Sequence, residues 1–95
     1  MSYYGELNYI TWLVKVRMEN EPKDYYMLRD MAREAWRQDP EQAQAITSEA
    51  LREYLQRNAP KLEGVYSDLM TAALAEVDYF SIAGYALEEV ENENK

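Results

Sequence analysis

The sequence predicts an all-α protein, a compact bundle of four to five short helices that forms a single domain over residues 1–95. Three observations lead to this prediction. Apolar residues recur at spacings of three and four along most of the chain, as on one face of an α-helix. Prolines and capping residues divide these stretches at short intervals, which favours antiparallel neighbours. A chain of 95 residues leaves room for one domain.

The first segment, from about Asn8 to Asn20, fits two structures. Its apolar residues alternate as in a strand, and an overlapping set also forms a helical stripe. We favour a helix, capped by Asn8 or Thr11, because no second strand-like run exists to pair with it. The strand pattern consists of Ile10, Trp12, Val14 and Val16, and the helical stripe of Tyr9, Trp12, Leu13 and Val16.

Prolines mark the starts of the next two predicted helices. Pro22 suits a first helical turn, and Asp39 followed by Pro40 reads as an N-cap and first position. The third helix is expected to stop near residues 58–60, before Pro60. The buried stripes are predicted to be Tyr25, Leu28, Ala32, Ala35 and Trp36 in the second helix, and Ala43, Ile46, Ala50 and Tyr54, beside Leu51 and Leu55, in the third.

Two more helices are predicted in the last third of the chain. One runs from Leu62 or Val65 to Val77, and Asp78 reads as the N-cap of the other. Residues 91–95 are expected to fray. The buried stripes are predicted to be Val65, Leu69, Ala72, Ala73 and Val77 in the first, and Tyr79, Ile82, Ala83, Ala86, Leu87 and Val90 in the second.

The composition argues against catalysis. The chain has no cysteine and no histidine, which excludes disulfides, thiolate metal sites and imidazole acid–base chemistry. Paired carboxylates remain, such as Glu49 with Glu53, but a carboxylate-bridged metal site normally adds histidine. We therefore expect no enzyme, no cofactor and no metal. No stretch is apolar enough for a membrane span or a signal peptide, so we expect a cytoplasmic protein.

Acidic residues are concentrated in the last third of the sequence. Residues 1–61 carry ten acidic and nine basic side chains, whereas residues 62–94 carry eight acidic side chains and no Lys or Arg. Such a charge distribution favours basic partners and argues against direct nucleic-acid binding. We therefore predict a partner-binding surface made of Glu63, Asp68, Glu76, Asp78, Glu88 and Glu89.

Two stretches resemble a known family. Asn8-Tyr9-Ile10-Thr11-Trp12-Leu13-Val14, followed by Glu19-Asn20-Glu21, is similar to the Asn-Tyr-x-Thr-Trp-x-Val opening motif of small uncharacterised proteins carried by phages and plasmids. Ser67-Asp68-Leu69-Met70-Thr71-Ala72-Ala73-Leu74-Ala75-Glu76-Val77-Asp78-Tyr79-Phe80-Ser81-Ile82-Ala83 is similar to their closing motif, which ends in Ala-Leu-x-Glu-Val-Asn-Trp-x-x-Ile-Ala. The match covers about a third of the chain. Asp78, Tyr79 and Ser81 replace Asn, Trp and Glu, and losing that Glu is expected to weaken the helix start. The resemblance implies an origin in a mobile element, where small acidic proteins often inhibit host defence.

The leading hypothesis is an inhibitor of a nucleic-acid-targeting defence system, of the anti-CRISPR or antirestriction kind. Its acidic surface would imitate nucleic-acid phosphates and occupy the basic groove of a host protein or ribonucleoprotein. The alternative is a structural or adaptor protein that forms a homodimer through aromatic surface and organises another phage or plasmid protein. Trp12 and Trp36 are expected in the core, whereas Tyr3, Tyr4, Tyr26, Tyr66 and Tyr85 fall partly off the stripes, and Tyr25, Tyr26 or Tyr85 would mark the shared patch.

Overall fold

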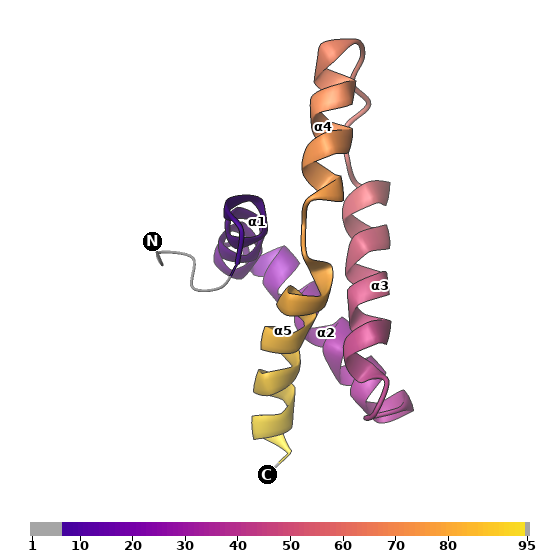
Figure 1. Cartoon of the computed structure of the whole chain (residues 1–95). Coiled ribbons are helices and arrows are strands. Elements are labelled where there is room, and N and C mark those ends of the chain that lie inside the picture. Colours follow the sequence, from indigo (N-terminus) through magenta and orange to yellow (C-terminus); the bar gives the residue numbers. More distant parts are fainter. Residues whose placement is uncertain (1–6, 95) are drawn as a thin grey trace.

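The computed structural model describes residues 7–94, which form five helices and no strand. They are α1 (Tyr9–Asn20), α2 (Pro22–Gln38), α3 (Ala43–Arg57), α4 (Val65–Ala75) and α5 (Tyr79–Glu93). The predicted bundle of four to five short helices is confirmed, as is a helix rather than a strand after Asn8. Helix α2 crosses α3 and α5, which lie side by side, and α1 packs against α2 and α5 (Figure 1). Helix α4 extends beyond the end of α3. Among the described residues, no helix is long and apolar enough to cross a membrane.

Helix α5 lies at the centre of the core. It packs against α1, α2 and α3, and all six apolar positions predicted for its buried stripe are buried. Pro22 occupies the first turn of α2, whose Leu28, Ala32 and Ala35 are buried against α5 and α3. In α3 the buried residues are Ala43, Thr47, Leu51 and Tyr54. The hydrophobic effect of these small, closely spaced side chains holds the four helices together.

Hydrogen bonds tie the start of α1 to the connection between α4 and α5. Asn8 caps α1 by accepting from the Thr11 amide at 2.8 Å, and its own side-chain amide donates to the Glu76 carbonyl at 3.0 Å. The buried Thr11 hydroxyl accepts from the Asp78 amide at 2.7 Å. The Glu76 carbonyl and the Asp78 amide of this connection thereby have hydrogen-bond partners outside the helices' own hydrogen-bond pattern.

Two buried tyrosines donate hydrogen bonds between helices: Tyr54 links α3 to α2, and Tyr79 links α5 to α4. The Tyr54 hydroxyl donates to Asp24 of α2 at 2.7 Å, and that hydrogen bond, with burial as a lesser cause, raises the pKa of Tyr54. The Tyr79 hydroxyl donates to the Leu74 carbonyl at 2.9 Å, and burial raises the pKa of Tyr79 despite the nearby charge of Arg52. Both phenols therefore keep their protons and act as hydrogen-bond donors at neutral pH.

The start of α3 differs from the prediction. The helix begins at Ala43, and Asp39 does not cap it but ends α2. The Asp39 carboxylate accepts from the Glu41 amide at 3.1 Å, and its carbonyl accepts from the Gln42 amide at 3.1 Å. These bonds form a tight turn over residues 40–42, because an aspartate side chain can satisfy nearby amides without a helix.

The predicted buried stripe of α4 is wrong for most of its members. Val65, Leu69 and Ala72 are exposed, Ala73 is half-buried, and Val77 is buried in the connection after the helix. The periodicity of an apolar stripe does not say whether another helix covers it, and α4 lies beyond the helices that could have done so (Figure 1).

Helix α5 continues through Glu93, into the stretch of residues 91–95 that is expected to fray. The Glu93 carboxylate is held by Arg29 and by Arg33, the latter at 3.0 Å, so the last turn of α5 is fastened to α2. Lys95 lies outside the described residues.

The two buried threonines provide a test of this fold. Thr11→Val should lower the free energy of unfolding by about 1–3 kcal/mol, because the Asp78 amide loses its acceptor. Thr47→Val should leave stability unchanged or slightly raised, because the Thr47 hydroxyl is buried without a hydrogen-bond partner among the described residues. Urea unfolding of both variants measures the difference, and equal losses would contradict the role assigned to Thr11.

Candidate functional site

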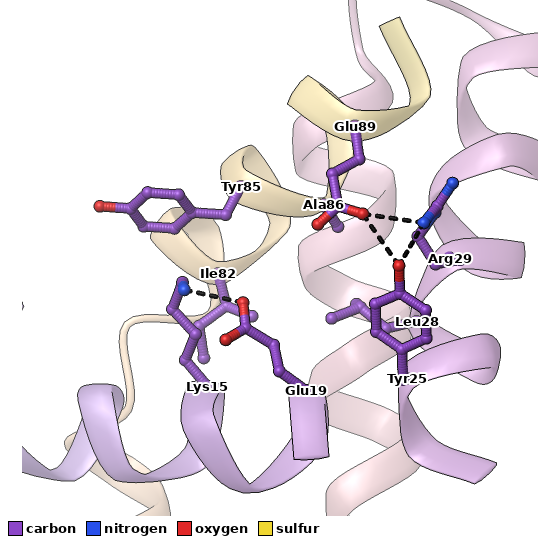
Figure 2. Close-up of a pocket in the computed structure, with 9 residues that line it drawn as sticks. All are labelled: Lys15, Glu19, Tyr25, Leu28, Arg29, Ile82, Tyr85, Ala86 and Glu89. Atoms are coloured by element: carbon purple, nitrogen blue, oxygen red, sulfur yellow. Dashed lines mark hydrogen bonds and ion pairs between the residues drawn. The ribbon is translucent and has the colours of Figure 1, made fainter. Parts of the chain in front are cut away.

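The six acidic residues predicted to form one binding surface lie in different surroundings. Glu89 faces α2, where its carboxylate accepts from Arg29 at 2.8 Å and from the Tyr25 hydroxyl at 3.1 Å (Figure 2). With Arg33 and Glu93, these residues form an ion-pair network between α2 and α5. The carboxylate of Glu89 is therefore paired within the fold, and its side chain is 45% exposed.

Asp78 has a structural task as well. Its carboxylate accepts from the Ser81 amide at 3.1 Å and from the Ser81 hydroxyl at 2.7 Å, so Asp78 is the N-cap of α5, as predicted. Ser81 thus supplies a second hydrogen bond to the cap where the resembled family has a glutamate. The carboxylate still lies at the surface.

The remaining predicted residues do not form a single cluster. Glu63 and Asp68 lie before and within α4, Glu76 follows α4, and all three are exposed. Glu88 is exposed in the second half of α5, the half that is farther from α4 along the chain. Asp78 and Glu88 line the same open groove, about 15 Å apart along α5, and Glu63 and Asp68 do not line it.

An open groove of about 910 Å³ collects Asp78 and Glu88 with two further carboxylates, those of Glu41 and Glu91. We call it the acidic groove. It lies between α5 and the turn that joins α2 to α3, and among residues 7–94 no Lys or Arg lines it. Four carboxylates without a basic neighbour in the lining produce a negative potential that a concave surface concentrates.

Small residues on α5 create the hollow of the acidic groove. Ser81, Gly84, Glu88 and Glu91 share one stripe of the helix, at spacings of three and four. The Gln44 side chain crosses α5 here and donates to the Phe80 carbonyl at 2.8 Å. A side chain at position 84 would meet the Gln44 amide nitrogen at 2.7 Å, so glycine lets Gln44 lie this close.

Sequence reasoning missed two of the four carboxylates. Glu91 was assigned to a frayed tail, although its spacing of three from Glu88 on a helix would have placed the two side by side. Glu41 lies 37 positions before Asp78, and no local pattern links them. Only the packing of α3 against α5 brings Glu41 to this groove.

A second cavity lies where α1, α2 and α5 meet, and it is too small for a substrate. Its volume is about 20 Å³, enough for about one water molecule. Leu28, Ile82 and Ala86 form its apolar floor (Figure 2). At its rim Lys15 bonds to Glu19 at 2.7 Å and lies 4.6 Å from the Tyr85 ring centre. The cavity is therefore a small gap in the packing of the three helices, and charged side chains lie at its rim.

Some of the aromatic residues expected at an interface already contact other side chains of the fold. The Tyr25 hydroxyl forms hydrogen bonds with Arg29 and Glu89, and the Lys15 ammonium group lies over the Tyr85 ring. Tyr26 and Tyr66 are largely exposed, whereas Tyr3 and Tyr4 lie outside the described residues. Trp36 packs half-buried against the core, and Trp12 is half-buried beside Tyr9.

No group of acidic side chains in residues 7–94 is arranged to hold a metal ion. Comparisons with protein families, with curated proteins and with solved structures find no match for this chain. The resemblance to a phage and plasmid family therefore stays a prediction.

Two neighbouring glutamates on α5 test whether the Glu89 charge stabilises the fold and the Glu88 charge does not. Glu89→Gln should lower the free energy of unfolding by about 1 kcal/mol, because largely buried Arg29 loses a charged partner. Glu88→Gln, which removes the same charge from the adjacent exposed position, should change stability by close to zero. Thermal unfolding at low and high salt measures both, and salt should shrink the difference. If the two variants lost equal stability, the network assigned to Glu89 would be wrong.

Proposed function

We propose that the protein is a non-catalytic binding protein whose acidic groove receives arginine and lysine side chains of a basic partner. The observation that carries the proposal is the lining of the groove, where the described residues contribute four carboxylates and no basic side chain. On α5, Glu89 and Glu93 are paired with arginines of α2, whereas Glu88 and Glu91 of the groove form no ion pair with a described residue.

The walls of the groove suit such side chains beyond charge alone. Trp36 and Tyr85 contribute aromatic surface, and Pro40 and Leu87 contribute apolar surface. A guanidinium group stacks on aromatic rings and bonds to carboxylates at its edge, and its apolar stem packs against apolar walls. Arginine is therefore the preferred occupant.

The proposed partner is a nucleic-acid-binding component of a host defence system. A protein of that kind presents arginines and lysines along a groove that holds phosphates, and an acidic surface can occupy it in their place. The resemblance to phage- and plasmid-encoded proteins supports this choice of partner. The protein would then act in the cytoplasm of the host as an inhibitor of the anti-CRISPR or antirestriction kind, without binding nucleic acid itself.

A pair of equally charged variants tests the groove. Changing Glu88 and Glu91 together to Gln should weaken binding of a fluorescent arginine-rich peptide roughly tenfold, because two carboxylates of the groove are lost. Changing Glu21 and Glu53 together to Gln removes the same charge from exposed positions outside the groove and should have little effect. Fluorescence anisotropy measures both affinities, and raising the salt concentration should weaken the wild type steeply.

The choice of partner has a separate test. Tagged protein incubated with a host lysate should capture a basic nuclease component at low salt and release it at high salt. Mass spectrometry of the captured proteins measures this. The Glu88 and Glu91 double variant should fail to capture it and should fail to restore phage infection in a host with that defence. Equal loss of peptide binding in the two double variants would mean that overall charge, not the groove, is responsible.

A further inference from the structure

Trp36 lies in the last turn of α2 and lines the acidic groove. It also lines the neighbouring hollow, together with Val90 and with Asn94, the C-cap of α5. Trp36 therefore lies beside the last two turns of α5, the part of the helix that carries Glu88 and Glu91. The indole packs half-buried against the core, so its ring is held in place before any ligand binds.

The second aromatic ring of the groove already contacts a cation of the fold. The Lys15 ammonium group lies 4.6 Å from the centre of the Tyr85 ring. Trp36 takes part in no cation–π contact within residues 7–94. Arg33 and Arg37, which line the neighbouring hollow, are paired with glutamates. Trp36 is therefore the aromatic wall that remains for a cation supplied by a partner.

The two ends of α5 give the acidic groove unequal charge. At one end Asp78 caps the helix, where the helix dipole is positive and Ser81 donates two hydrogen bonds to the carboxylate. At the other end Glu91 lies in the last turn, where the dipole is negative and which contains no basic residue. Glu88, one turn earlier, forms no ion pair with a described residue, and neither does Glu91. Along α5, the negative potential is therefore strongest beside Trp36.

A guanidinium group suits these surroundings better than an ammonium group does. It is planar, so it can stack on an indole and still donate from its edge to carboxylates. An ammonium group is compact and more strongly hydrated, and it gains less from an aromatic wall.

We propose that Trp36 sets a preference of the acidic groove for arginine, because one arginine of the partner stacks on the indole and donates to Glu88 and Glu91. A basic residue at the Asp78 end adds less. The partner therefore needs one arginine at this place and not a run of basic residues. This inference rests on the proposed function and deepens it, since it names the side chain of the partner that anchors the complex.

Titration with two short peptides tests the preference. Both are capped Gly-Ser peptides, one with a single central arginine and the other with a single central lysine. Wild-type protein should bind the arginine peptide with a Kd on the order of 1 mM and the lysine peptide at least roughly fivefold more weakly. Chemical shifts of backbone amides in the groove, followed by NMR, measure both affinities.

Substitution of Trp36 should remove this preference. Trp36→Leu should bring the two affinities to within about twofold of each other, and Trp36→Phe, which keeps an aromatic face, should retain most of the difference. Circular dichroism checks that each variant is folded, because the indole packs against the core. An unchanged preference in folded Trp36→Leu would overturn the proposal.

The indole signals provide a readout that leaves Trp36 in place. The chain has two tryptophans, and Trp12 does not line the groove. Trp12→Phe identifies the indole N–H signal of Trp36, which should move during titration with the arginine peptide. If this signal stayed in place up to about 20 mM peptide while an arginine-rich peptide still bound, the inference would be wrong and the proposed function would stand. If the arginine-rich peptide also failed to bind, both would be wrong.

Matched substitutions test which end of α5 holds the arginine. Glu91→Gln should weaken binding of the arginine peptide roughly fourfold. Asp78→Asn removes the same charge, keeps a residue that caps helices well, and should weaken binding less than about twofold. Equal weakening by the two variants would place the arginine elsewhere in the groove and overturn the proposal.

Discussion

The hydrogen bonds between the start of α1 and the α4–α5 connection determine the arrangement of the whole molecule. Thr11 holds the Asp78 amide and Asn8 holds the Glu76 carbonyl, so the chain must turn sharply between Ala75 and Tyr79. From that fixed point α5 enters the core between α1, α2 and α3. On the other side of this connection, α4 extends beyond the end of α3 (Figure 1). The connection therefore lies between α5, which is buried in the core, and α4, which has no buried residue.

The same contact gives a physical reason for the two motifs that resemble the phage and plasmid family. Asn8 and Thr11 belong to the opening motif, and Glu76 and Asp78 belong to the closing motif, yet the two meet in space. Each of these residues makes a hydrogen bond that joins α1 to the α4–α5 connection or caps a helix. The motifs thus carry the information for a fold, and the residues proposed to bind partners lie mainly outside them. Function in proteins of this architecture would depend on the exposed positions of α5.

In the acidic groove the proposed attraction is electrostatic, so salt should weaken it and arginine-rich partners should be preferred.

Local sequence determined the helices and the N-caps Asn8 and Asp78, because capping and apolar spacing act over a few residues. It also determined the buried face of α5, whose apolar stripe is uninterrupted. It did not determine that α3 starts after a turn at Asp39, since that residue can serve either structure. Only the tertiary structure decided which stripes are covered and which charges are paired. Glu89 and Glu93 meet arginines of α2 some 60 residues away, and Glu41 lines the same groove as Glu88 and Glu91. Val65, Leu69 and Ala72 of α4 stay exposed among the described residues. Helix packing decides these contacts because it brings together residues that no local pattern relates.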